Sequence, residues 1–426
     1  MPHTAKAFES VEPRITCIHR VAKPKAALQW SEWVTPKPGQ REPIHRWFLF
    51  PHSFSREIVN ELLVTWKLSP GSKLLDPFAG AGTTLLAAKQ YNYSAIGYDL
   101  SPLAVFVSNV KVAHYTQAIV SDWERLVRDL SKPTPISMVA PPEILKRAFT
   151  SRSWDALMHI RDAIAKMRSG KHRAFFELAL LVTLSSFSRA QRSGGWLRWV
   201  SNTEDCREII PAFKNQVRVM LEDVSRSSSS PRSFVCRAYL GDARALPSSH
   251  RDIDAVITSP PYPNRHDYSR IFNIELSFSF LSEQAIRRLR SDSFRSHVEA
   301  RPMPYEVNEY ERPARLAKII SSIKKRAVDQ RVPRMIDGYF EDIFLNLRSM
   351  LPRLKKGAPL AYIVGNVRYH GITIPVDQIT AEIGSKVGLK VNDIFVARYR
   401  GNSAQQMGKY GRSPSRESVL VMSKIS

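Results

Sequence analysis

The chain has 426 residues, of which 63 are Lys or Arg and 39 are Asp or Glu, so its formal net charge is +24. This surplus indicates a polyanionic partner, and a nucleic acid fits better than a membrane surface. No apolar run approaches the ~20 residues that a membrane span needs, and the N-terminal MPHTAKAFES lacks the apolar core of a signal peptide. Cys17, Cys206 and Cys236 form neither a zinc pattern nor a disulfide framework, which indicates a reducing cytoplasm and no bound metal.

The first 116 residues predict an irregular arm followed by an α/β unit. Residues 1–44 are rich in proline, and Trp30 and Trp33 are expected to anchor this arm to the body. From residue 73 onward the pattern reads strand (73–78), helix (82–90), strand (94–100) and helix (101–113). Because strands alternate with helices, we expect a parallel sheet with its ligands at the carboxyl ends of the strands.

Two insertions interrupt this pattern. Residues 117–233 are expected to be mainly helical and to end in a flexible polar link, SRSSSSPRS. Residues 283–335 are basic, and the stretch 284–334 holds 13 Lys or Arg against 6 Asp or Glu. The predicted organisation is therefore an arm (1–44), a catalytic domain (45–116, 234–282 and 336–426) and two insertions, with the last two strands pairing as an antiparallel hairpin.

Residues 73–84 read KLLDPFAGAGTT, an apolar strand followed by a glycine turn and a helix start. Gly80 and Gly82 lack a Cβ and let the backbone approach a ligand closely. The third glycine of a dinucleotide fingerprint is missing, which argues against NAD and FAD. Asp76 ends this strand and Asp99 ends the next one, and each could alternatively cap a helix.

Residues 254–262 read DAVITSPPY, a second apolar strand that ends in Ser-Pro-Pro-Tyr. Taken alone, this motif could be a proline-stiffened turn. Following the glycine motif, it resembles the catalytic motif of S-adenosylmethionine-dependent DNA amino-methyltransferases. The resemblance covers 45–113, 234–276 and 356–424. It implies a Rossmann-like α/β methyltransferase fold, with a mostly parallel seven-stranded sheet, a C-terminal antiparallel hairpin and helical insertions.

The resemblance also implies a cofactor site for S-adenosyl-L-methionine. Asp99 would accept both ribose hydroxyls, Asp242 would receive the adenine amino group, and Asp76 would help to hold the methionine end. The run 45–48 resembles the N-terminal motif of the family, which also contacts the methionine end. The full set of expected cofactor residues is His45, Trp47, Asp76, Pro77, Phe78, Ala79, Gly80, Gly82, Thr83, Asp99, Leu100, Asp242 and Ala243.

For the catalytic loop, the resemblance implies direct methylation of an exocyclic amine on a flipped base. The Ser259 hydroxyl and the Pro260 carbonyl would accept hydrogen bonds from the amine. Pro260 and Pro261 stiffen the loop, and Tyr262 would stack on the base. No covalent enzyme–base adduct is expected, so no cysteine is needed. Ser259 favours cytosine N4, since adenine enzymes of this superfamily usually have Asp or Asn at that position.

Three segments are expected to contact DNA. Arg265 follows the catalytic loop directly, whereas Tyr268, Phe272 and Leu276 are spaced as the core stripe of a helix. The run SRAQRSGGWLRW (188–199) and the basic stretch 284–334 are the other two segments. Most of their arginines are expected to bind phosphates rather than bases. The named candidates are Arg189, Arg192, Arg265, Arg287, Arg288 and Arg290.

The sequence thus predicts a cytoplasmic enzyme that methylates cytosine N4 in double-stranded DNA. Its setting would be a restriction–modification system or another self-marking system, with a cognate nuclease or defence proteins as partners. Three alternatives stay open: a DNA adenine-N6 methyltransferase, an RNA methyltransferase, and a DNA-binding subunit that has lost catalysis.

Overall fold

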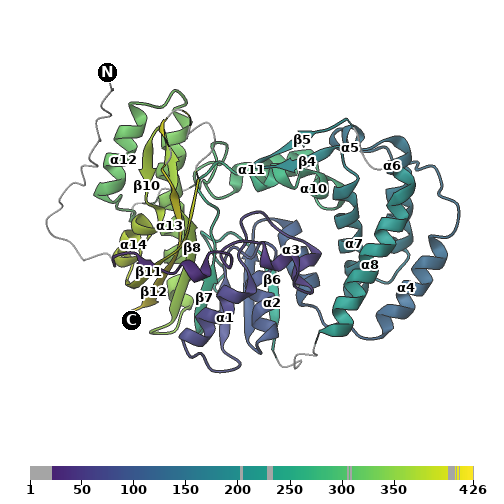
Figure 1. The fold of residues 1–426 in the computed structure, drawn as a ribbon, viewed down its shortest axis with the longest axis horizontal. Helices are drawn as coiled ribbons and strands as arrows, with labels where there is room; N and C mark the ends of the chain where they lie inside the picture. The colour runs from purple at the N-terminus through teal and green to yellow at the C-terminus, as the bar shows by residue number, and fades with distance from the viewer. Residues whose placement is uncertain are drawn as a thin grey trace, which may run out of the picture.

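The computed structural model describes residues 22–425, except 202–204, 228–233, 305–306, 308, 402–407, 409 and 412. Cys17 and the rest of residues 1–21 of the N-terminal arm lie outside the described residues. The centre of the molecule is an eight-stranded sheet (Figure 1). Its strands, in spatial order, are β1 (Lys25–Ala26), β11 (Leu389–Arg400), β12 (Ser415–Lys424), β8 (Pro359–Gly365), β7 (Ala255–Thr258), β2 (Lys73–Asp76), β3 (Ser94–Asp99) and β6 (Cys236–Leu240).

The strand order confirms the predicted Rossmann-like fold. Neighbouring strands from β6 through β8 pair in parallel, and β12 runs antiparallel to both β8 and β11. Without β1, the order is third, second, first, fourth, fifth, seventh and sixth, so the chain reverses its winding direction between β2 and β7. Ligands of open α/β sheets bind at such a reversal. The sheet differs from the prediction by one strand, because two residues of the arm pair with β11 as β1.

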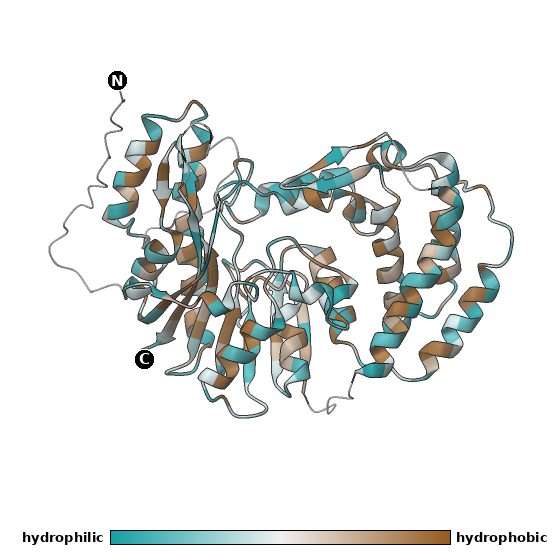
Figure 2. Ribbon diagram, viewed as in Figure 1, coloured by the Kyte–Doolittle hydropathy of each residue, from teal (hydrophilic) through white to brown (hydrophobic). Residues whose placement is uncertain are grey.

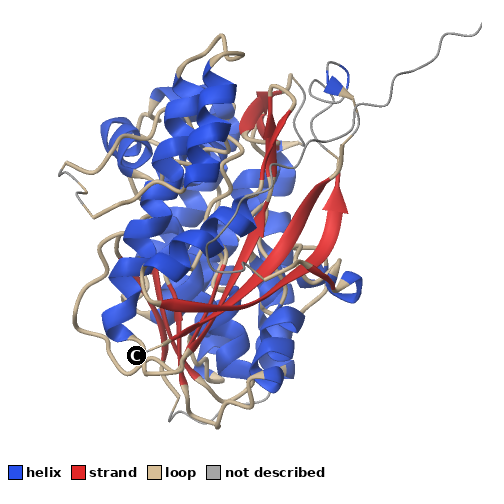
Figure 3. Cartoon of the chain, turned by 90° about the vertical axis from the view of Figure 1, so that its left-hand side faces the viewer, coloured by secondary structure: helices blue, strands red, loops and turns tan. Residues whose placement is uncertain are grey.

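Each face of the sheet is covered by its own set of helices (Figure 3). Neighbouring residues of a strand point to opposite faces, and Leu74 and Leu75 accordingly belong to different core clusters. The Leu74 side packs against α1 (Arg56–Thr65), α2 (Thr83–Gln90) and α3 (Pro102–Val112). The Leu75 side packs against α12 (Ala314–Lys324), α13 (Arg331–Met350) and α14 (Val376–Lys386). The central strands are accordingly hydrophobic on both faces, whereas α1, α12 and α13 are amphipathic (Figure 2).

The first insertion forms the helical end of the molecule (Figure 1). Its helices are α4 (Ala118–Asp129), α5 (Glu143–Ala148), α6 (Ser151–Ala165), α7 (Lys171–Ser186) and α8 (Ile209–Arg226). They share one hydrophobic core with α1 to α3, so the insertion is packed onto the catalytic domain. The prediction of a mainly helical segment missed one feature, a β-hairpin made of β4 (Ala190–Ser193) and β5 (Trp196–Trp199). Gly194, with φ of +59°, forms its turn.

The remaining elements connect the catalytic loop to the last strands. They are α9 (Tyr268–Ile271), α10 (Asn273–Ser279), α11 (Glu283–Asp292) and a small hairpin of β9 (Val367–Tyr369) and β10 (Ile372–Ile374). Five short 3-10 helices complete the fold: η1 (Leu28–Trp30), η2 (Pro38–Gln40), η3 (His45–Trp47), η4 (Cys206–Glu208) and η5 (Leu351–Arg353). Helix α13 runs across the predicted boundary at residue 335. Within the described ranges, no helix combines the length and the apolar character that crossing a membrane requires.

Candidate active site

A pocket lies at the carboxyl ends of the central strands, with about 1160 Å³ of empty space that includes open solvent. The loops after β2, β3, β6 and β7 all contribute to its lining, as the order of the sheet requires. The pocket brings together most of the predicted cofactor residues and part of the catalytic loop. These residues are Pro77, Phe78, Ala79, Gly80, Thr83, Asp99, Leu100, Asp242, Ala243, Ser259 and Pro261.

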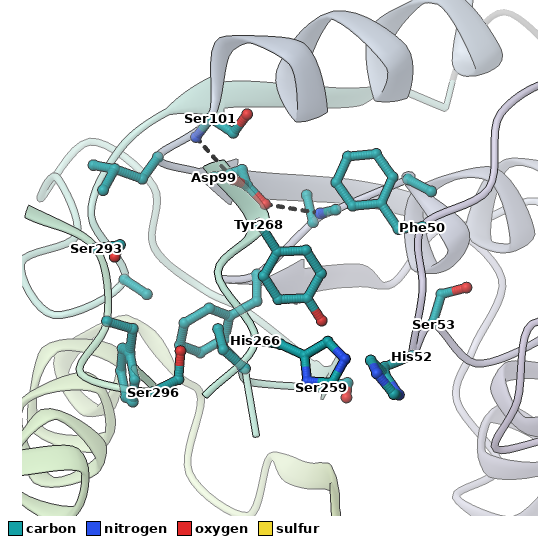
Figure 4. Close-up of a pocket in the computed structure, with 18 of the residues that line it drawn as sticks. Phe50, His52, Ser53, Asp99, Ser101, Ser259, His266, Tyr268, Ser293 and Ser296 are labelled. Carbon is teal, nitrogen blue, oxygen red and sulfur yellow. Dashed lines mark hydrogen bonds between the residues drawn. The ribbon is translucent and has the colours of Figure 1, made fainter. Parts of the chain in front are cut away.

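Asp99 presents its carboxylate at the end of β3. One oxygen accepts the Gly80 N–H and the other accepts the Ser101 N–H, each at 2.9 Å (Figure 4). Burial raises the pKa of Asp99, whereas these backbone hydrogen bonds lower it. An ionised carboxylate has more than one lone pair on each oxygen, so both oxygens can still accept a hydrogen bond from a ligand. This arrangement suits a vicinal diol.

The two glycines of the first motif have different roles. Gly80 lines the pocket with φ of +50°, a conformation that favours glycine. Gly82 also has a positive φ, but it does not line the pocket, and a Cβ there would lie 2.8 Å from the Ser108 hydroxyl oxygen. Contact between Gly82 and the ligand therefore stays a prediction. Gly82 instead allows the start of α2 to pack against α3.

Asp76 lies beneath the pocket rather than in its wall. It is 1% exposed, and its Oδ1 accepts hydrogen bonds from the Thr258 hydroxyl (2.6 Å) and the Phe78 N–H (3.1 Å). Burial raises the pKa of Asp76 to about 6. The carboxylate thus ties the glycine loop to the end of β7, and it holds the positions of both motifs.

Asp242 belongs to a buried ionic network. Its carboxylate receives three hydrogen bonds from the Arg244 guanidinium, the shortest of which is 2.7 Å from Nη2. Arg244 lies 3.3 Å from Asp342 on α13 and donates to the Asp292 carbonyl at the end of α11. Arg295 forms a second ion pair with Asp342. Burying so many charges is tolerable because each is paired. The network fastens the loop after β6 to the second insertion.

The expected cofactor residues His45 and Trp47 lie in the core, outside the pocket, and their contact with the methionine end stays a prediction. His45 contacts Gln90, and the Trp47 indole N–H donates to Asp223 at 3.0 Å. Burial lowers the pKa of His45 to about 3. The following run, Phe50–Phe54, lines the pocket instead. The N-terminal contribution to the pocket thus begins at Phe50, just after the run 45–48 that the resemblance indicated.

Ser259 is held by a neighbouring strand. Its hydroxyl donates to the Ile363 carbonyl on β8 at 2.9 Å. Because the hydroxyl hydrogen is used in this bond, the lone pairs of the oxygen remain available as acceptors. Ser259 and Pro261 line the pocket. The loop therefore offers a fixed hydrogen-bond acceptor at the carboxyl end of β7.

Tyr262 does not line the pocket, contrary to the expected stacking role. Its ring is 5% exposed and packs against Gly365, where a Cβ would lie 2.7 Å from Cε2 of the ring. The guanidinium of Arg400 lies 5.6 Å from the ring centre. Burial raises the pKa of Tyr262. The side chain anchors the catalytic loop to β8.

Three aromatic side chains that the sequence did not single out for the pocket stand near Ser259. His52, His266 and Tyr268 all line it, and Figure 4 shows Tyr268 between Asp99 and the two imidazoles. The rings of His52 and His266 meet edge to face with centroids 4.6 Å apart. Burial lowers the pKa of both, that of His52 to about 4. Both imidazoles are thus neutral at physiological pH.

The expected core stripe is confirmed for Phe272 and Leu276, which are both buried in the hydrophobic core. Tyr268 is only partly buried, and both Tyr268 and Phe272 also line the pocket. The second insertion also supplies a wall through Ser293, Phe294, Ser296 and His297. No periodicity marks these residues in the sequence, since they follow α11 in an irregular segment.

Two of the predicted DNA-contacting arginines form ion pairs with buried carboxylates. Arg192 forms an ion pair with the buried Glu275 and lies 4.6 Å above the ring of Phe272. Arg290 lies 2.7 Å from Asp267, a buried carboxylate that caps α9. Both guanidinium groups have carboxylate partners within the protein, and phosphate binding by Arg192 and Arg290 stays a prediction. Four of the candidates are exposed: Arg192, Arg265, Arg287 and Arg288. Arg189 is partly buried.

The residues of this pocket fit S-adenosylmethionine. The cofactor has a ribose diol, a flat adenine and a charged amino-acid end. Asp99 offers acceptors for a diol, and the loop of Asp242 and Ala243 adds a carboxylate and an apolar surface. Gly80 keeps the wall open where its Cβ would stand, 3.7 Å from Phe50. When bound, the cofactor supplies an electrophilic methyl group.

Sequence comparison identifies relatives of this chain among DNA methyltransferases. A family model described as DNA methylase matches residues 16–108. The Type II methyltransferase M.AvaI of Anabaena variabilis is 30% identical over 428 residues, covering 92% of this chain and 88% of its own. M.BsoBI of Geobacillus stearothermophilus is 27% identical over 446 residues, covering 92% and 87%. Among solved structures, the rRNA methyltransferase aviRa of Streptomyces viridochromogenes matches with a TM-score of 0.31 and 11% identity, covering 91% and 87%.

The fold and pocket define an S-adenosylmethionine-dependent methyltransferase. The chain belongs to the family of Type II DNA methyltransferases that modify exocyclic amino groups. The predicted family and cofactor are therefore confirmed.

Proposed function

We propose that the protein methylates the N4 amine of cytosine in duplex DNA. The observation that supports this most directly is the orientation of the Ser259 hydroxyl. It donates to Ile363 and so faces the pocket as an acceptor. An amine hydrogen can bind to that oxygen without competition from the hydroxyl's own hydrogen.

The chemistry depends on the geometry of the amine. Its lone pair is delocalised into the pyrimidine ring, so the nitrogen is a poor nucleophile. Hydrogen bonds from the amine to Ser259 Oγ and the Pro260 carbonyl would draw its hydrogens out of the ring plane and localise the lone pair. Positioning supplies most of the rate enhancement. Asp76 contributes by fixing the end of β7 relative to the glycine loop.

A base inside a duplex cannot reach this pocket, so the target cytosine must be flipped out. The rings of Tyr268, His52 and His266 line the pocket near Ser259 and offer flat apolar surfaces to the base. Tyr262, buried against Gly365, would support the loop from behind.

The proposal extends to the setting of the enzyme. A Type II methyltransferase protects DNA in a restriction–modification system, and we place this chain in the cytoplasm beside a cognate endonuclease. The net charge of +24 agrees with a DNA substrate.

Nucleoside mass spectrometry provides the test. Purified protein is incubated with S-adenosylmethionine and unmethylated plasmid DNA, and the digested DNA is analysed for methylated nucleosides. N4-methylcytosine is the expected product. N6-methyladenine would overturn the base assignment and leave the family standing. Transfer to RNA alone would overturn the DNA assignment.

A further inference from the structure

The β4–β5 hairpin lies above the carboxyl edge of the sheet (Figure 1). Its turn touches the loop that follows the catalytic motif. A Cβ on Gly195 would lie 3.5 Å from the Cα of His266, and His266 lines the pocket. A duplex that delivers a flipped base to this pocket therefore passes close to the hairpin.

One face of the hairpin is fixed to the body. Cross-strand partners share a face, so Arg192 and Leu197 lie on the same side. Arg192 is paired with the buried Glu275 and stacked over Phe272. On the same side, Trp199 packs under Arg147, whose guanidinium lies 3.9 Å from the centre of the indole ring. These contacts hold the hairpin in one orientation.

The opposite face of the hairpin is exposed and carries polar side chains and one tryptophan. Its cross-strand pairs are Gln191 with Arg198 and Ser193 with Trp196. Arg198 donates to the Gln191 side-chain oxygen at 3.3 Å, which leaves other N–H groups of both side chains free. Trp196 is 66% exposed. In the described part of the chain, no carboxylate pairs with Arg198.

We propose that this outward face, made of Gln191, Ser193, Trp196 and Arg198, reads base edges in the major groove beside the flipped cytosine. A two-stranded ribbon fits a major groove about 12 Å wide, and Arg and Gln are side chains that recognise guanine and adenine there. Trp196 supplies an apolar contact surface for the bases. The inference rests on the proposed DNA substrate, and it adds Arg198 to the arginines of this segment that are expected to contact DNA.

The double variant Gln191→Ala/Arg198→Ala tests the inference. Wild type, the variant and Arg251→Ala are expressed in a bacterial host without its own methyltransferases, and methylated sites are mapped by single-molecule sequencing. Arg251 is an exposed charge before β7, at the opposite end of the strands. We expect the double variant to accept other bases at one or two positions. Its kcat/KM on the mapped site should fall by roughly 10- to 100-fold. Arg251→Ala should keep the wild-type site.

Binding to duplex oligonucleotides completes the test. Arg198→Ala should weaken binding to the mapped site and leave binding to a duplex without the site nearly unchanged. Calorimetric affinity for S-adenosylmethionine should stay at the wild-type value. If the double variant keeps the same site, or if Arg198→Ala weakens both duplexes equally, the hairpin does not read bases. If wild type methylates no DNA, the proposed function fails, and the inference fails with it.

Discussion

The hydroxyl of Ser259 donates to the carbonyl of Ile363 at 2.9 Å, across the neighbouring strands β7 and β8. This bond fixes the rotation of the hydroxyl, and it leaves the lone pairs of an oxygen in the pocket lining available as acceptors. The Ser259 side chain lies on a loop, but its hydroxyl is held in place by a strand of the sheet.

The substitution Ser259→Ala tests this role. It removes the acceptor and should lower kcat by about 100-fold, the lower range for a group that acts in the transition state. Affinity for S-adenosylmethionine should not change, because Asp99 and the glycine loop are untouched. Single-turnover methyl transfer and calorimetry give the two values. Equal losses in both would indicate that Ser259 only shapes the pocket.

Asp99 is the carboxylate that we expect to bind the ribose. In Asp99→Asn, one oxygen is replaced by an NH₂ group, so a diol loses a charged acceptor. Cofactor affinity should fall by about 1.5–3 kcal/mol, the usual worth of a hydrogen bond to a charged group. Isothermal titration calorimetry measures the change. A folded variant with wild-type affinity would remove Asp99 from the binding site.

The agreement between sequence and structure follows from the geometry of parallel sheets. Asp99, Asp242 and Ser259 each follow a strand, and these strands end at the same edge, so their meeting could be predicted. The side chains of His52 and His297 reach the pocket through irregular loops, which no periodicity describes. Only the structure shows that residues of the second insertion, such as His297, form a wall of the pocket.

The orientation of the arginines in SRAQRSGGWLRW (188–199) could not be predicted from the sequence either. Gly194 and Gly195 could have signalled a hairpin, but the register decides which residues face outward. Arg192 faces inward because Glu275 is buried beside it. A count of positive charges cannot distinguish Arg192 from Arg198.

The basic stretch of the second insertion requires a revised test. Arg287 and Arg288 are exposed on α11, whereas Arg290 holds the buried Asp267. Arg287→Ala/Arg288→Ala should weaken binding to target and non-target DNA alike. The slope of log K against log salt should become shallower by about 0.9 for each lost phosphate contact. Fluorescence anisotropy at several salt concentrations measures it, and an unchanged slope would exclude this surface.

Arg290→Ala should behave differently. It removes a partner of Asp267, the residue that caps α9 beside the pocket, and leaves only Arg270 as an ion-pair partner from the same helix. We expect a loss of about 1–3 kcal/mol in the free energy of unfolding, with little change in the salt slope. Urea denaturation distinguishes the two variants. If Arg290→Ala is as stable as wild type and lowers the slope, Arg290 contacts DNA instead.

The buried carboxylate of Asp76 predicts a pH dependence of stability. Its pKa is about 6 in the folded chain, against an ordinary value of 3.8. The folded protein therefore binds this proton more tightly than the unfolded chain, and stability falls as pH rises from about 4 to about 6. Asp76→Asn keeps an oxygen to accept from Thr258 and Phe78 but cannot ionise.

From pH 4 to pH 7, the stability of Asp76→Asn relative to wild type should therefore increase, by up to about 3 kcal/mol for a shift of about two pH units. Urea unfolding at a series of pH values measures the difference. Asp252→Asn, at an exposed position, is the matched control and should follow the wild-type pH profile. Parallel profiles for Asp76→Asn and wild type would show that Asp76 stays ionised in the folded protein throughout this range, compensated by its hydrogen bonds.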